Sequence, residues 1–286
     1  GGSYNNNINQ SSESSLCLAR LPSGTCFIQR NTPKAIEGTG LEFEASVNKR
    51  FSLAGHHGLI FRSLLFGNVY HNHTQFNENT LTSKFGYSYQ NAKNQIFVSP
   101  LFEHKGLANE TLYNAWGASA EWLNILSPQR ALKIETNIKQ QEYQKRGLRF
   151  QNGIEVSAFI TFWNQFNNGW FVFAGADYLQ KNSRNKVFSM NQPGVRFGVS
   201  KPLFDGIDAT LFTSFRERRF AEYNAILRKK RLDYEQNYTL VVNAERFAVM
   251  GISPSLTVRY SHINSKVDWL FTHDKTTVSL KFNRKF

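Results

Sequence analysis

Apolar and polar side chains alternate over long stretches of this chain. In the segment 276–286, apolar residues stand at every second position over much of its length, with polar residues between them. A period of two places successive side chains on opposite faces of a β-strand, so each strand has one apolar face. The pattern recurs along the chain and predicts fourteen strands, at residues 25–32, 41–52, 58–71, 80–90, 95–105, 111–126, 130–144, 153–164, 170–180, 193–202, 207–220, 232–245, 254–263 and 276–286.

The connections between these predicted strands alternate in length. Short ones lie near 92–93, 127–129, 166–168, 204–206 and 250–251, and longer polar ones at 72–79, 106–110, 145–150, 181–192, 221–231 and 264–275. A soluble sandwich has no reason to keep this order, whereas a membrane barrel has short periplasmic turns and long outer loops. Counted back from the last strand, every short turn falls on one side. With an even number of strands, we expect both termini in the periplasm.

Composition is consistent with a barrel in a membrane. No run approaches the roughly 18 to 20 apolar residues of a membrane-spanning helix. The mean hydropathy of −0.44 fits a barrel because lipid-facing and lumen-facing residues average out. The aromatic content of 14% suits aromatic girdles. We therefore predict an all-β fold, a transmembrane antiparallel up-and-down β-barrel of about fourteen strands. The alternative is a soluble sandwich whose edge strand happens to end in Phe.

The last predicted strand has a second interpretation. A closing strand that ends in Phe resembles the signal read by the barrel-insertion machinery of the bacterial outer membrane. We expect this strand to pair with the first predicted strand, residues 25–32, and so to close the barrel. The residues interpreted as the assembly signal are Val278, Leu280, Phe282 and Phe286.

The N-terminal region is polar and rich in Asn and Ser, which predicts a flexible lead-in over 1–22, followed by the barrel over 23–286. Residues 1–3 resemble a cloning scar or a mature N-terminus. The cysteines are Cys17 and Cys26, and a disulfide that closes a short local loop would indicate an oxidising compartment. A reduced pair is the alternative. A metal site normally needs four ligands, and no His pair has the matching spacing, so we expect none.

The polar face of the predicted strands would line a lumen. A barrel of about fourteen strands is wide enough to hold one. Its charges would either serve passage or form a mutually neutralised interior network. The lumen-lining candidates are Lys84, Lys133, Glu135, Arg196, Arg216, Arg218, Arg259 and Lys281.

The formal net charge of +13 raises the question of the partner. The basic residues are spread through strands and loops, and no nucleic-acid-binding motif is present, so we expect no nucleic-acid partner. The densest basic runs, 216–219 and 228–231, flank one outer loop. They would contact anionic lipopolysaccharide or attract an acidic client. No catalytic or phosphate-binding motif is found, and we expect neither enzymatic activity nor a cofactor.

Several segments resemble, in order and spacing, the surface lipoprotein assembly modulator family. The resemblance covers about residues 36–286. The segments that carry it are 86–94, 100–103, 117–123, 216–219 with Tyr223, 231–233, 251–260, 264–265, 268–271 and 281–286.

This resemblance implies a fourteen-stranded outer-membrane barrel that promotes delivery of surface lipoproteins to the cell surface. In some members the clients are secreted soluble proteins, and clients include haem- and metal-acquisition proteins. Family members usually carry an N-terminal periplasmic repeat domain, which this chain lacks, so we expect it to be the barrel portion of a longer protein. The expected partners are the client, outer-membrane lipid and lipopolysaccharide, and the barrel-assembly machinery. The alternative function is a passive porin-like diffusion channel.

Overall fold

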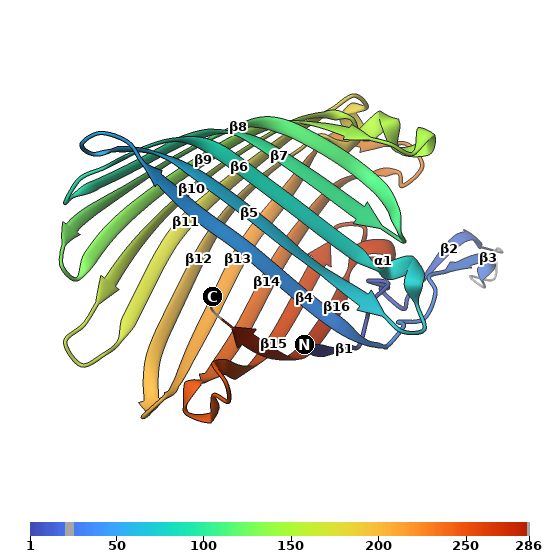
Figure 1. The fold of residues 1–286 in the computed structure, drawn as a ribbon. Coiled ribbons are helices and arrows are strands. Elements are labelled where there is room, and N and C mark those ends of the chain that lie inside the picture. The colour runs from blue at the N-terminus through green and yellow to red at the C-terminus, as the bar shows by residue number, and fades with distance from the viewer. Residues whose placement is uncertain (21–25, 285–286) are drawn as a thin grey trace.

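The computed structural model, which describes residues 1–20 and 26–284, is a closed antiparallel barrel of fourteen strands (Figure 1). Each strand pairs with its neighbour in sequence, as in an up-and-down barrel. This confirms the predicted fold class. The barrel strands are β1 (Gly2–Asn5), β4 (Gly38–Ser52), β5 (His57–Tyr70), β6 (Glu78–Gln90), β7 (Asn94–Leu107), β8 (Glu110–Ser127), β9 (Arg130–Tyr143), β10 (Gly153–Gln165), β11 (Phe171–Ser183), β12 (Met190–Phe204), β13 (Ile207–Asn224), β14 (Lys229–Ala244), β15 (Ile252–Ser265) and β16 (His273–Arg284).

The strand that closes the barrel is not the predicted one. β1 lies between β16 and β4, with Gly2 opposite Leu280 on one side and Leu41 on the other. The prediction that residues 25–32 pair with the last strand is therefore wrong. It failed because β1 is short and contains glycine, so it shows no alternation. Gly1 also lies against β16, where an added Cβ would stand 2.0 Å from the Leu280 carbonyl oxygen.

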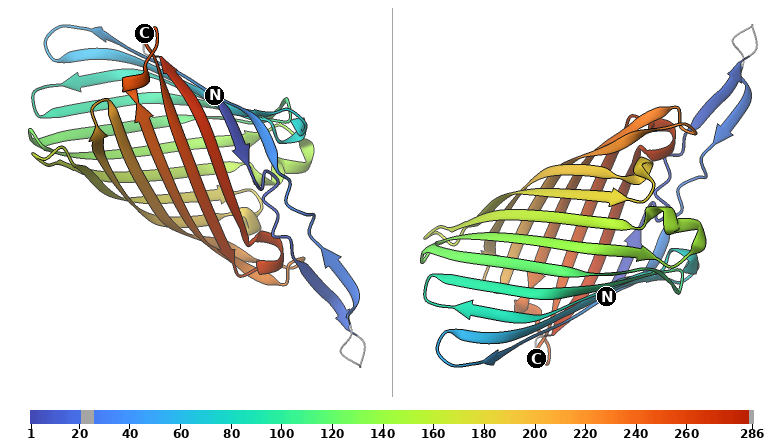
Figure 2. Two further views of the ribbon diagram at one scale, coloured as in Figure 1. Left: turned by 90° about the horizontal axis from the view of Figure 1, so that it is seen from below. Right: turned by 90° about the horizontal axis from the view of Figure 1, so that it is seen from above.

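The predicted first strand belongs to a small separate hairpin. β2 (Ser15–Arg20) and β3 (Cys26–Asn31) form a two-stranded sheet, and Thr25 lies outside the described residues. Figure 2 shows this hairpin projecting beyond one end of the barrel. A disulfide joins Cys17 to Cys26 across it.

The segment that precedes this hairpin is held by specific hydrogen bonds. The hydroxyl of Ser14 donates to the backbone carbonyl oxygen of Trp269 at 2.8 Å. The side-chain amide of Asn7 donates to the backbone carbonyl oxygen of Asp274 at 2.9 Å. The sequence predicted a flexible lead-in here, and the structure joins these residues by hydrogen bonds to α1 and β16. Their contacts reach to the far end of the sequence, and composition alone does not reveal such long-range pairing.

The two faces of the wall differ as the alternation predicts. Leu41 is 62% exposed on the outer face, whereas its neighbour Glu42 is 7% exposed and points inward. Large apolar residues are exposed around the outside of the barrel, among them Phe85, Phe162, Phe197, Leu240 and Leu280. An outer surface of this kind requires an apolar surrounding. No helix in the described part of the chain is long and apolar enough to cross a membrane.

The connections sort largely by length between the two barrel ends. One end, here called the short-turn end, carries the turns 53–56, 91–93, 128–129, 166–170, 205–206 and 245–251, the last with η4 (Glu245–Phe247). The other, the long-loop end, carries the hairpin segment 6–37, η1 (Thr74–Phe76), η2 (Arg146–Gln151), η3 (Lys186–Phe188), the turn 225–228 and α1 (Asp268–Phe271).

Two connections at the long-loop end depart from the prediction. The loop expected at 221–231 is reduced to the four-residue turn 225–228 between β13 and β14. The expected loop 106–110 is a tight turn between β7 and β8, with Ala108 and Asn109 both at positive φ, 54° and 62°. Such a pair of conformations matches the twist of a hairpin and needs only two residues. Polar composition alone therefore overestimated the length of this loop.

Candidate functional site: the barrel lumen

The eight predicted lumen residues all lie on the inner wall, but in different parts of it. Arg216, Arg218, Arg259 and Lys281 border a cavity of about 680 Å³. Lys133, Glu135 and Arg196 border a smaller one of about 260 Å³, and Lys84 lies in an ion-pair network with Glu135.

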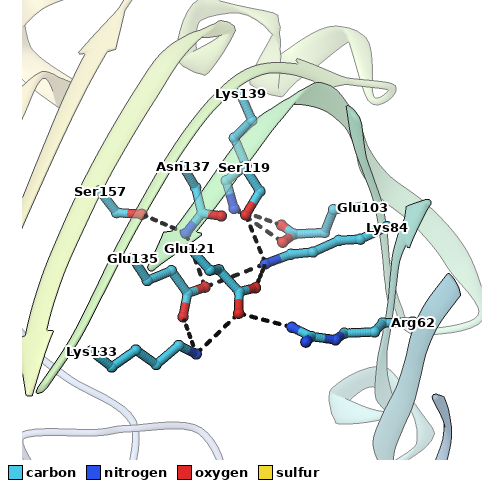
Figure 3. A network of polar contacts seen from close by, with 10 residues as sticks. All are labelled: Arg62, Lys84, Glu103, Ser119, Glu121, Lys133, Glu135, Asn137, Lys139 and Ser157. Carbon is cyan, nitrogen blue, oxygen red and sulfur yellow. Dashed lines mark hydrogen bonds and ion pairs between the residues drawn. The ribbon is translucent and has the colours of Figure 1, made fainter. Parts of the chain in front are cut away.

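The centre of that network is Glu121 on β8, which sequence reasoning missed. Its carboxylate lies 2.8 Å from Arg62 on β5, 3.1 Å from Lys84 on β6 and 3.2 Å from Lys133 on β9. Figure 3 shows the Lys84 ammonium placed between Glu121 and Glu135, with Lys133 bridging the same two carboxylates from the other side. The network ties together strands that are not neighbours in the wall. The alternation of inward and outward residues along β8 could have predicted that Glu121 faces the lumen. It could not have predicted that Glu121 contacts Arg62.

A second ion-pair group stands beside the first on the same wall. Lys139 on β9 lies 2.9 Å from Glu103 on β7 and 3.1 Å from Glu155 on β10. The hydroxyl of Tyr113 donates to Glu103 at 2.7 Å, and the amide of Gln141 donates to Glu155 at 3.0 Å. Paired charges thus fill this side of the lumen and brace strands β5 to β10.

The opposite wall carries further ion pairs around the 680 Å³ cavity. Arg216 reaches Asp177 at 2.9 Å, and Arg218 reaches Glu235 at 3.0 Å. Glu235 also lies 3.7 Å from Arg216.

Near the closing strand β1, one carboxylate on the inner face forms ion pairs with residues on the other side of that strand. Glu42 on β4 lies 3.0 Å from Arg259 on β15 and 3.2 Å from Lys281 on β16, so it spans β1. Neutralised pairs therefore account for much of the predicted lumen charge. Arg196 differs, because it donates to the Thr161 hydroxyl at 2.7 Å and stacks over the Phe159 ring at 5.2 Å.

The described residues of the predicted assembly signal lie on the outer face of the barrel. Val278 and Leu280 point outward on β16, as does Phe282, and Phe286 lies outside the described residues. In the part of the chain that the structure describes, no group of three or more His, Cys, Asp or Glu side chains is arranged to hold a metal ion.

A closed fourteen-stranded barrel with an apolar outer face and a charged, partly open interior defines an integral outer-membrane β-barrel protein. The family model described as "Surface lipoprotein assembly modifier" matches residues 1–286. The chain belongs to this family.

Curated relatives agree with this assignment. The chain is 44% identical over 294 residues to the "Hemophilin secretion modulator" of Acinetobacter baumannii, covering all of this chain and 59% of the relative. It is 26% identical over 271 residues to the "Surface lipoprotein assembly modifier" of Pasteurella multocida, covering 86% of this chain and 52% of the relative. The chain thus spans a little over half the length of these relatives.

Solved structures align with this chain only at low sequence identity and with TM-scores below 0.5. A crystal structure of a Pseudomonas aeruginosa FadL homologue aligns with a TM-score of 0.46 and 10% identity, over 98% of this chain and 88% of that one. Acinetobacter baumannii OccAB3 aligns with a TM-score of 0.46 and 8% identity, over 92% and 80%.

Proposed function

We propose that this chain is the membrane barrel of a translocator that delivers a client protein across the bacterial outer membrane. The client would be a surface lipoprotein or a secreted soluble protein such as one used in haem acquisition. The observation that carries the proposal is the match to the "Hemophilin secretion modulator", which covers the entire chain at 44% identity. The lumen would then act as a passage and not as a catalytic centre.

The chemistry of the lumen suits an unfolded polypeptide. A chain crossing a membrane must keep its backbone N–H and C=O groups hydrogen-bonded to water or protein. The 680 Å³ cavity is lined by groups that can exchange such bonds, including Asn68, Ser214, Asn237 and Ser261. Folding of the client outside the cell would then favour outward movement, because the folded domain cannot return.

The proposed function also implies an orientation in the membrane and further partners. The short-turn end would face the periplasm and carry the C-terminal end of β16. Gly2 lies within the wall, opposite Leu41 and Leu280, and the chain direction of β1 leads back from it toward the same end. The long-loop end would then meet lipopolysaccharide, and the exposed Arg228, Lys229 and Lys230 suit its anionic groups. The outward Leu280 and Phe282, with the terminal Phe286, would serve recognition by the barrel-assembly machinery.

A passive diffusion channel is the second candidate, and the open 680 Å³ cavity favours it. The two functions differ in conductance. A diffusion pore conducts ions steadily, whereas a translocator should be closed or gated when idle. In planar bilayers, the purified barrel is expected to show low or intermittent current. A large and steady current would support the channel instead.

The deciding experiment is a surface-display assay with the complete gene product in a Gram-negative host that lacks it. Hemophilin, the protein named in the description of the relative, serves as the probe client. Antibody labelling of intact cells and the culture medium measures export. Hemophilin should appear outside only when the complete protein is present. Equal export with and without it would refute the proposal.

A further inference from the structure

A group of aromatic side chains lies inside the barrel, where the charged lumen would not require them. Phe159 and Trp163 on β10 share the inner face with Thr161, whereas Phe162 between them is exposed on the outside. Most of these rings lie on strand segments close to the short-turn end. The aromatic residues of this inner group are Phe97, Phe159, Trp163, Phe173 and Phe212.

These rings border two small cavities, here called the aromatic pockets. The larger, of about 260 Å³, is lined by four rings, those of Phe159, Trp163, Phe173 and Phe212, and by the polar residues Lys133, Glu135, Thr161 and Arg196. The smaller, of about 180 Å³, is lined by Phe97, Leu123 and Trp163 on its apolar side, and its polar side is formed by Arg62, Gln95, Glu121 and Lys133. Trp163 borders both pockets, so they adjoin.

The larger pocket depends on a missing side chain. Phe173 on β11 stacks with Phe212 on β13 at 5.8 Å between ring centroids and 22° between planes. Gly198 on the intervening strand β12 leaves the space for this contact, because an added Cβ would stand 2.0 Å from the Phe173 ring. Any other residue at this position would displace the ring.

The aromatic pockets continue into the large cavity. Phe212 borders both the 260 Å³ pocket and the 680 Å³ cavity. Three cavities therefore follow one another through shared residues, from the smaller aromatic pocket to the open part of the lumen. Arginines lie against the rings of both pockets: Arg196 over Phe159 at 5.2 Å and Arg62 over Phe97 at 4.6 Å.

We propose that the aromatic pockets hold apolar side chains of an extended client polypeptide on its way through the lumen. This rests on the proposed function and names its contact site. Each pocket has the size of one or two side chains, far below that of a folded domain. The rings would accept an aromatic or branched apolar residue, and Arg196 would favour a neighbouring carboxylate. The preferred client segment is thus extended, apolar at intervals and acidic between.

Site-specific crosslinking tests this contact in the complete protein. A photoreactive phenylalanine analogue replaces Trp163 or Phe212, and hemophilin is co-expressed as the probe. Phe197 and Phe215, which face outward on β12 and β13, are the matched controls. Hemophilin should crosslink at the two inner positions and not at the outer ones. Crosslinking no stronger than at the controls, in cells that still export hemophilin, would overturn the proposal.

Substitution supplies an independent readout. Phe212→Ala and Trp163→Ala should each lower exported hemophilin by about two- to tenfold, the ratio expected for a lost aromatic contact, whereas Phe197→Ala should not. Heat-modifiable gel mobility confirms that each variant is folded. If the wild type does not export hemophilin, the proposed function fails. If the wild type and the inner variants export it equally, only the proposed aromatic site is refuted. If the inner variants raise the ion current through the barrel without lowering export, the rings form a constriction for solutes instead.

Discussion

The substitution Glu121→Gln should weaken the barrel more than any single charge removal at its surface. It keeps the shape of the side chain and removes the carboxylate that Arg62, Lys84 and Lys133 share, at 2.8, 3.1 and 3.2 Å. Lys84 and Lys133 still have Glu135, at 3.3 and 3.1 Å. Arg62 loses the carboxylate it contacts in the wild type.

The magnitude follows from burial. Removing one partner from a fully buried pair costs about 3–5 kcal/mol. Glu121 is 9% exposed, but Arg62 and Lys133 are 29% and 32% exposed and can be partly hydrated. We therefore expect a loss of about 2–3 kcal/mol in the free energy of unfolding, below the fully buried value. Arg62→Met in the same variant should recover part of this loss by removing the cation that has lost its carboxylate.

Urea unfolding of the barrel in lipid vesicles, followed by tryptophan fluorescence, measures the change. Glu44→Gln is the matched control, because Glu44 is 57% exposed and lies 3.7 Å from Lys281. It should alter the free energy of unfolding by less than about 0.5 kcal/mol. If Glu121→Gln lost no more than this control, the network would not brace the wall, and the reasoning from charge pairing would be wrong.

Three further changes test other parts of the structure. Gly198→Val should cost about 1–3 kcal/mol by overpacking against Phe173, seen in the same urea assay; wild-type stability would contradict the ring placement. Replacing Cys17 and Cys26 by serine should make the β2–β3 hairpin sensitive to protease while barrel melting stays unchanged, since the hairpin is a separate sheet; a destabilised barrel would show that the hairpin supports it. Deleting Phe286 should lower the amount of barrel assembled in cells, measured by heat-modifiable mobility, whereas unchanged assembly would rule it out as a signal.

Long strands were predictable because their residues follow one rule locally. In β15, apolar residues such as Leu256 alternate with polar ones, and this pattern survives any shift in exact boundaries. β1 obeys no such rule. Its four residues include Gly2, and its place between β16 and β4 is set by pairing with both. A short strand whose position depends on distant partners leaves almost no local trace.

For the lumen as well, the sequence predicts which side chains face inward but not which of them contact one another. Alternation predicts which side chains face inward, such as Lys84 and Lys133. It does not predict that both meet Glu121 or that Arg62 joins them across 59 positions of sequence. The aromatic pockets escaped for a different reason. β10 carries rings on both faces, Phe159 inside and Phe162 outside, so periodicity could not assign them.

Both walls of this lumen carry ion pairs, but the open space lies mainly along one of them, and under the proposed function that asymmetry bears on the route of a client. The wall from β5 to β10 is crossed by short ion pairs centred on Glu121 and Lys139, so moving a polypeptide through it would separate several buried charges at once. The wall formed by β13 to β16 and β4 borders the 680 Å³ cavity. There, Arg259 is nearly half exposed even though it contacts Glu42, so it can exchange that partner for groups of a passing chain at lower cost. Under the proposed function, the main chain of a client would therefore run along the second wall, beside the strands that close the barrel. Its apolar side chains would reach the aromatic pockets past Phe212, which borders both the 680 Å³ cavity and the larger pocket.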